Sequence, residues 1–125
     1  MPAEVYKEKL DNIIADICKD PSLFVRHPGR DFTRDRKLPL ETMLKIIIGM
    51  EGGSLNRELY DYDHSLDVTA SAFVQQRGKI LPEMFEYIFS KFNRSCSDEK
   101  TYRGYRLLAV DGSGVSIATD PDAPT

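Results

Sequence analysis

The sequence predicts a mainly α-helical fold, in which a bundle of four to five helices is followed by a C-terminal β-hairpin. Two observations lead to this prediction. Up to about residue 95, apolar residues recur at helical spacing; beyond it, the chain turns polar and then places two short apolar runs around a Gly-rich turn. With 125 residues, 41% of them apolar and 30% charged, the chain suits one compact soluble unit with an appendage. We therefore expect a helical domain over residues 1–95 and a distinct segment over residues 96–125.

Residues 4–19 predict the first helix. Five apolar residues share one face because they fall at i, i+3, i+4, i+7 and i+8. They are Leu10, Ile13, Ile14, Ile17 and Cys18. Asp20-Pro21 ends this helix, since the residue before a proline is pushed out of the helical region.

Residues 25–37 are polar and predict a connector, and the apolar stretch after them predicts the central helix. Pro39 suits a first helical position, where its missing N–H costs nothing. The apolar residues that follow cover nearly all faces of a helix; they are Leu40, Met43, Leu44, Ile46, Ile47, Ile48 and Met50. We therefore place this helix at the centre of the core, with Gly52-Gly53 as its stop.

Three further helices are predicted between residues 54 and 93. Ser54 caps a short helix that runs through Tyr62, and Thr69 caps another that runs from Ala70 to Lys79. Leu81-Pro82 opens the last helix, which runs to about Asn93. Its apolar face is predicted from the spacing as Phe85, Ile88, Phe89 and Phe92.

The segment after Ser95 predicts the hairpin. Residues 105–110 predict a buried strand, residues 111–114 a turn and residues 115–118 a second strand. A lone hairpin is too small to be stable by itself, so we expect it to pack on the helices or to belong to a larger sheet.

The N-terminal residues, the apolar runs and the two cysteines indicate the compartment in which the chain is expected. Residues 1–10 are charged and lack the apolar stretch and cleavage site of an export signal, so we expect the chain in the cytosol. No apolar run approaches the roughly 20 residues of a membrane span. Cys18 and Cys96 are predicted to be reduced thiols that form neither a disulfide nor a zinc site.

The net charge of −3 hides two basic zones. Residues 26–57 hold seven Lys and Arg against four Asp and Glu, and residues 69–107 hold the same numbers. A DNA duplex could contact both zones if the fold places them on one side of the molecule.

The helices predicted at 54–62 and 69–79 are separated by an acidic turn, as in a helix-turn-helix. In that motif the second helix reads base edges, and Gln is a geometric partner of adenine. Two solvated helices of a bundle fit the same spacing. The DNA-contact candidates on the second helix are Thr69, Ser71, Gln75, Gln76, Arg77 and Lys79.

The connector supplies a second set of DNA-contact candidates. Its cations suit phosphate contacts, which position a protein on DNA without reading sequence. A solvated loop with local Asp–Arg ion pairs explains the same composition. The candidates are Arg26, Arg30, Arg34, Arg36 and Lys37.

Asp111 follows the predicted strand and precedes Gly-Ser-Gly. A carboxylate at a strand end can hold a divalent metal, whereas two-metal phosphoryl transfer needs several carboxylates. Asp-Gly is also a favoured hairpin dipeptide. From the residues alone, both interpretations of Asp111 stay open.

Three stretches, in this order, resemble the opening part of DDE transposases of the insertion-sequence-four group. The first is Phe-Thr-Arg-Asp-Arg-Lys-Leu-Pro-Leu at residues 32–40, which leads into the central helix. The second is Thr-Ala-Ser-Ala-Phe-Val-Gln-Gln-Arg at residues 69–77, and the third is Arg-Leu-Leu-Ala-Val-Asp-Gly-Ser at residues 106–113. The resemblance covers nearly the whole chain from about residue 25.

The resemblance implies a helical DNA-binding part followed by an RNase H-like core that cuts and joins DNA with Mg²⁺ held by two aspartates and a glutamate. Asp111 matches the first of these aspartates, which makes residues 96–125 a linker and the first hairpin of that core. The chain ends at Thr125, before the other two carboxylates, so we expect it not to cleave DNA by itself. The implied partner is insertion-sequence-end DNA in the nucleoid, with no membrane and no small-molecule substrate.

A protein-interaction or homo-oligomerisation domain without DNA specificity is the alternative expectation. Transposases assemble as multimers, and an apolar hairpin offers a sheet edge to a second chain.

Overall fold

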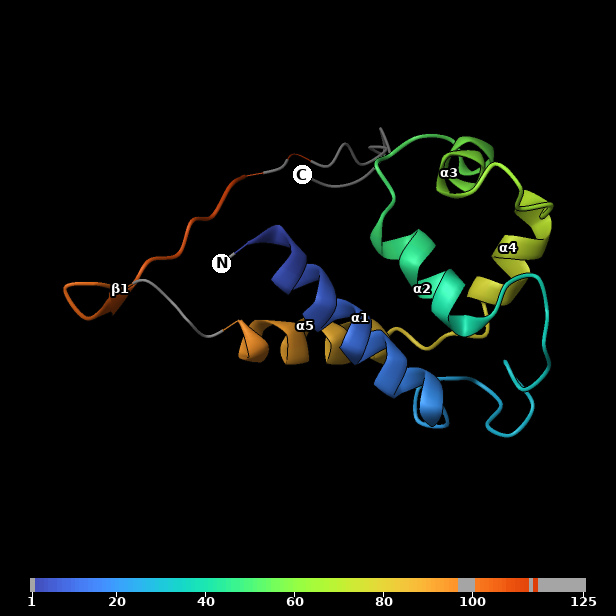
Figure 1. Ribbon diagram of the computed structural model, residues 1–125, viewed down its shortest axis with the longest axis horizontal. Coiled ribbons are helices and arrows are strands. Elements are labelled where there is room, and N and C mark those ends of the chain that lie inside the picture. Colours follow the sequence, from blue (N-terminus) through green and yellow to red (C-terminus); the bar gives the residue numbers. More distant parts are fainter. Residues whose placement is uncertain (1, 97–100, 113, 115–125) are drawn as a thin grey trace, which may run out of the picture.

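The computed structural model describes residues 2–96, 101–112 and 114, and it is mainly helical, as the sequence predicts (Figure 1). The helices are α1 Ala3–Lys19, α2 Leu40–Ile48, α3 Leu55–Tyr62, α4 Ala70–Arg77 and α5 Glu83–Ser95. Two short strands, β1 Thr101–Tyr102 and β2 Tyr105–Arg106, form one antiparallel hairpin with Thr101 opposite Arg106. The connector between α1 and α2 spans residues 20–39.

Helix starts follow the predicted capping residues. The Ser54 hydroxyl accepts a hydrogen bond from the Arg57 N–H at 3.3 Å, and the Thr69 hydroxyl accepts one from the Ala72 N–H at 3.1 Å. Each bond satisfies a backbone donor that has no partner within its helix. Pro39 lies one position earlier than predicted: its backbone is extended and it caps α2 instead of beginning it.

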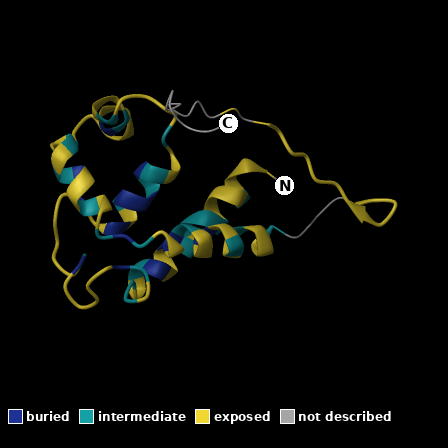
Figure 2. Ribbon diagram, turned by 180° about the vertical axis from the view of Figure 1, so that it is seen from behind, coloured by how far each residue is buried: buried dark blue, intermediate teal, exposed yellow. Residues whose placement is uncertain are grey.

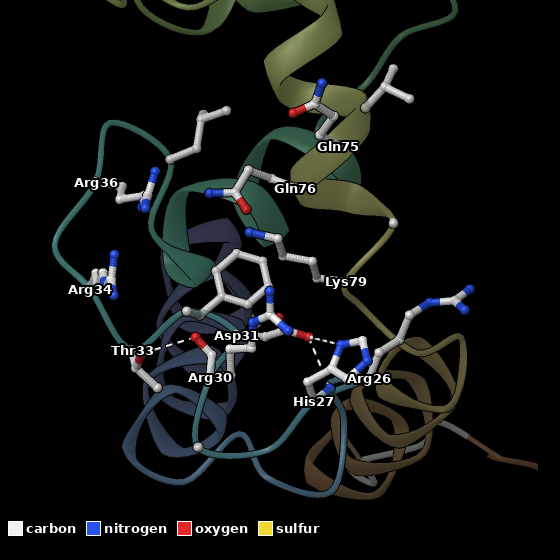
Figure 3. A pocket seen from close by; sticks show the side chains of 15 residues that line it. Arg26, His27, Arg30, Asp31, Thr33, Arg34, Arg36, Gln75, Gln76 and Lys79 are labelled. Carbon is white, nitrogen blue, oxygen red and sulfur yellow. Dashed lines mark hydrogen bonds and ion pairs between the residues drawn. The ribbon is translucent and has the colours of Figure 1, made fainter.

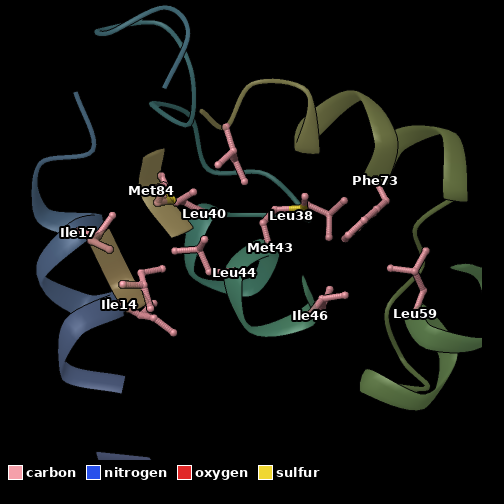
Figure 4. Packing of buried hydrophobic residues seen from close by; sticks show 12 residues of the cluster. Ile14, Ile17, Leu38, Leu40, Met43, Leu44, Ile46, Leu59, Phe73 and Met84 are labelled. Carbon is pink, nitrogen blue, oxygen red and sulfur yellow. The ribbon is translucent and has the colours of Figure 1, made fainter. Parts of the chain in front are cut away.

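Helix α2 is the centre of the core. This confirms the prediction made from the apolar residues on nearly all of its faces. It contacts α1, α3 and α4. Figure 4 shows its side chains between Ile14 and Ile17 of α1 on one side and Leu59 and Phe73 of α3 and α4 on the other. Four residues of α2 are buried: Leu40, Met43, Leu44 and Ile46. The predicted face of α1 also lies in or against this core (Figure 2).

Three helix details differ from the prediction. Helix α4 ends at Arg77 and not at Lys79, with Gly78 as its C-cap. Helix α2 ends at Ile48 and not at Met50: the Gly49 N–H makes the last i→i−4 bond, to the Lys45 carbonyl at 3.1 Å, and the Met50 N–H turns to the Ile47 carbonyl at 3.5 Å. On α5, the buried residues are Met84 and Ile88, whereas Phe89 is 69% exposed. The backbone of α5 lies closest to α1, and Phe89 is outside the buried cluster, so the buried stripe of α5 is narrower than its apolar face.

The hairpin also differs from the prediction. Its turn is formed by Arg103 and Gly104, both with positive φ, which is the backbone of the favoured two-residue hairpin turn. Residues 107–110 are exposed and form no strand, because no described segment lies beside them to pair with their backbone groups. The predicted strand is therefore wrong beyond Arg106, and the predicted second strand over 115–118 lies outside the described residues. The backbone of the described hairpin lies away from the five helices (Figure 1).

Among the residues that the structure describes, no helix combines the length and the apolar character that crossing a membrane requires. The two cysteines, Cys18 and Cys96, are both free and half-buried.

Cys18 is expected to react slowly with iodoacetamide near pH 8. Burial, and then the nearby Glu41 carboxylate, raise the pKa of the Cys18 thiol, while Lys45 opposes them. Because the thiolate is the nucleophile, a raised pKa lowers the reactive fraction. In a Cys96→Ser variant, native protein should be alkylated more slowly than the same protein in urea. A native rate equal to or above the unfolded rate would contradict this account.

Candidate functional site

The start of the connector is attached to the segment after α4. Val25 and Ile80 form an isolated antiparallel bridge, and both side chains are buried. The Arg26 N–H donates to the Lys79 carbonyl at 2.9 Å, and the Leu81 N–H donates to the Phe24 carbonyl at 2.8 Å. These bonds hold two segments that are more than fifty residues apart in the sequence next to each other. They bring the two predicted sets of DNA-contact candidates to one face.

A cavity of about 680 Å³ opens between the connector and α4 (Figure 3). In the view of Figure 3, the connector forms the left and lower sides of the cavity. Helix α4 and the residues after it form the side that carries Gln75, Gln76 and Lys79. Its polar and charged lining residues are Arg26, His27, Arg30, Asp31, Thr33, Arg34, Arg36, Gln75, Gln76 and Lys79. Seven of these ten are predicted DNA-contact candidates.

A second hollow of about 530 Å³ continues along the same face. It shares Arg36, Gln75, Gln76 and Lys79 with the first cavity and extends to Lys37 and Thr69. We call the two together the cationic groove. The groove runs along the side of α4 that faces the connector.

The charges of the first cavity are strongly unbalanced. Five cations and a single carboxylate line it; the cations are Arg26, Arg30, Arg34, Arg36 and Lys79. None of these five side chains forms an ion pair or a hydrogen bond with any described residue, whereas Lys45 and Arg57 elsewhere on the surface do pair. The predicted alternative of local Asp–Arg ion pairs is therefore not what the described connector contains. Unneutralised like charges around one hollow attract anions.

Lys37 differs from the other connector cations. Its ammonium lies 3.1 Å from the Asp67 carboxylate and also donates to the Asp67 carbonyl at 3.1 Å. Both side chains are exposed, so the pair contributes little to stability. Lys37 instead ties the end of the connector to the segment before α4.

The one carboxylate of the cavity, Asp31, has a structural role. Asp31 is only 5% exposed, and its Oδ2 accepts the backbone N–H of His27 at 2.9 Å and lies 3.4 Å from His27 Nδ1. The next residue, Phe32, has a φ of 56°, which bulky side chains rarely adopt. Packing of Phe32 against the core holds this backbone in place. The turn over residues 27–32 thus fixes where Arg30 projects.

Replacing Asp31 by alanine is expected to lower the free energy of unfolding by about 1–3 kcal/mol, because the His27 N–H loses its acceptor in a part-buried position. Urea denaturation followed by circular dichroism measures the change. Asp35→Ala is the matched control: this exposed connector carboxylate has no partner among the described residues, so about 0.5 kcal/mol or less is expected. Equal losses in the two variants would contradict the role of Asp31.

Three predicted contact residues lie at the margin of the groove or outside it. Thr69 lines the second hollow, where its hydroxyl is engaged in capping α4. Ser71 and Arg77 are exposed on α4 but line neither cavity. On α4, fewer residues line the groove than the sequence offers as contact candidates.

Asp111 is separate from the groove. It is exposed in the segment after the hairpin, and in the described part of the chain no three carboxylate, histidine or cysteine side chains gather to hold a metal ion. The described residues thus supply one carboxylate toward the expected Mg²⁺ site, which does not fit a two-metal centre.

Two features of the site give almost no signal in the sequence. The Val25–Ile80 bridge is a single residue pair, so it has no periodicity to detect. The Asp31 carboxylate resembles any connector carboxylate; its only sequence signal is the four-residue spacing from His27.

No protein-family model, curated protein or solved structure matches this chain.

Proposed function

We propose that the cationic groove binds the phosphate backbone of DNA. One observation carries the proposal: five cations from two distant segments line the first cavity of this groove, and none of them is neutralised by a described residue. A DNA phosphate chain supplies closely spaced negative charge, and each phosphate that a cation neutralises releases condensed counterions. Arginine suits this task because its planar guanidinium donates two parallel hydrogen bonds to a phosphate.

We propose further that the chain is the DNA-binding part of an insertion-sequence transposase. The first two stretches that resemble this class, residues 32–40 and 69–77, both border the cationic groove. In this proposal, these two stretches resemble those of such transposases because their side chains contact the same ligand, DNA. In this proposal insertion-sequence-end DNA is the partner, and Asp111 with Mg²⁺ belongs to the cutting and joining reaction of the whole enzyme.

A helix-turn-helix made of α3 and α4 is a finer form of the same proposal. The two helices contact each other, and the groove side of α4 offers Gln75 and Gln76. The connection over residues 63–69 is longer than the three to four residues of the usual helix-turn-helix turn. The groove, and not this motif, therefore carries the proposal.

Fluorescence anisotropy with a labelled duplex tests DNA binding. At low salt we expect saturable binding, and at physiological salt a dissociation constant in the range of about 10⁻⁴ to 10⁻⁶ M for a random sequence. Insertion-sequence-end DNA should bind more tightly than the random duplex. Absence of binding at low salt would refute the proposal.

Homo-oligomerisation is a second candidate function, supported by the exposed apolar side chains after the hairpin. Leu107, Leu108 and Val110 are 70%, 75% and 93% exposed. Exposed apolar segments of this kind favour pairing with a second copy of the chain. Sedimentation velocity should then show a dimer that is lost in a Leu108→Asp variant. A monomer at high protein concentration would contradict this candidate.

A further inference from the structure

The amide of Gln76 stands between the two hollows of the cationic groove and lines both of them. Figure 3 shows its side chain extending from α4 toward the space between Arg36 and Lys79. Its Oε1 is buried and accepts no hydrogen bond from any residue that the structure describes. The neighbouring cations, which are strong donors, do not satisfy it.

An unsatisfied buried acceptor lowers stability, because its hydration is lost and nothing replaces it. Buried polar atoms in folded proteins nearly always have a partner, so an exception in a candidate binding site indicates a partner that arrives with the ligand. That partner must be a hydrogen-bond donor. Phosphate and sugar-linking oxygens of the DNA backbone only accept, so they can satisfy Arg36 and Lys79 but not Gln76 Oε1.

We infer that Gln76 reads a base edge, and that its partner is adenine in the major groove. This inference rests on the proposed function. A glutamine amide presents an acceptor and a donor side by side once its terminal torsion turns toward the groove. Adenine presents the complementary pair, the N6 amino donor and the N7 acceptor, whereas guanine offers only acceptors there and cytosine only a donor.

The cations and Gln76 therefore have different tasks. Arg30, Arg34 and Lys79 hold the backbone and set affinity, while Gln76 sets sequence preference at one position. The surrounding cations make this division effective, because they fix the duplex close enough for a short amide side chain to reach a base edge.

Selection from a pool of duplexes with a randomised centre tests the inference. The wild-type protein should enrich adenine at one position or more, and the Gln76→Ala variant should lose that enrichment. On the selected duplex, the variant should bind about 5- to 150-fold more weakly, the factor of one bidentate base contact, with an unchanged dependence on salt. Replacing the selected adenine by 7-deazaadenine should weaken the wild type but not the variant any further.

Thermal unfolding separates this role from a structural one. Gln76→Ala removes an acceptor that has no described partner, so its melting temperature should equal or exceed that of the wild type. A marked fall would identify Gln76 as a structural residue and overturn the inference.

The remaining outcomes distinguish the two proposals. Duplex binding without any sequence enrichment, or with the same enrichment in Gln76→Ala, would overturn base reading by Gln76 and leave backbone binding by the groove intact. Absence of binding to every duplex at low salt would refute the proposed function, and the inference with it.

Discussion

Replacing Arg30, Arg34 and Lys79 together by glutamine is expected to weaken duplex binding by about 500-fold at 0.1 M salt, because three phosphate contacts and their released counterions are lost. If all five unpaired cations of the cavity contact phosphates, the logarithm of affinity should fall with the logarithm of salt at a slope of about −4.5. Removing three contacts should change that slope to about −1.8. Anisotropy titrations over a range of salt concentrations measure both quantities.

A second triple variant controls for net charge. Lys7, Lys91 and Arg94 are exposed cations on α1 and α5, outside the cationic groove. Replacing them by glutamine changes the total charge by the same amount but removes no groove contact, so the slope should stay near that of the wild type. Similar slopes for the two triple variants would show that binding depends on overall charge and not on the groove.

Replacing Phe73 by alanine is expected to lower the free energy of unfolding by about 3–5 kcal/mol. Phe73 is fully buried, and its ring attaches α4 to the core around α2. Its loss removes apolar contacts and leaves a cavity that neighbours such as Met43 cannot fully occupy. For a domain with a typical stability of about 5–15 kcal/mol, such a loss is a large fraction of the total. Urea denaturation followed by helical circular dichroism measures it.

Phe89→Ala is the matched control, since it removes the same ring from a site that is 69% exposed. It should change stability by about 0.5 kcal/mol or less. Helix α4 forms one wall of the groove. If Phe73→Ala detaches α4 from the core, the variant should therefore also bind the duplex more weakly. A larger loss for Phe89 than for Phe73 would contradict the described core.

The helical part could be predicted because its determinants are local. The apolar spacing of α1, the nearly all-apolar α2 and the caps Ser54 and Thr69 act over a few residues, and the structure confirms each of them. Phe89 lies on the predicted apolar face of α5 and yet is exposed. Spacing shows which residues share a face of a helix, but not how much of that face a neighbouring element covers. The described hairpin turns at Arg103-Gly104, where both φ values are positive, and not at Asp111-Gly112, while the second strand expected over 115–118 lies outside the described residues.

The residues of the candidate site could be predicted, but their meeting in one groove could not. Cations on a polar connector and glutamines on a short helix are visible in the sequence one at a time. What joins them is a single bridge between Val25 and Ile80, together with the Asp31 turn. Such long-range contacts leave no periodic pattern and no bias in composition that could be detected in the sequence. The unpaired oxygen of Gln76 is likewise a property of the packed structure alone.

Nuclear magnetic resonance of the uniformly ¹⁵N-labelled chain, titrated with duplex DNA at low salt, tests the groove as the DNA-binding surface most directly. We expect the largest amide shift changes in the connector over residues 26–37 and in residues 70–79, with small changes along α1. Changes confined to α1 and α5, or to the exposed segment after the hairpin, would show that DNA contacts another face and would contradict the account.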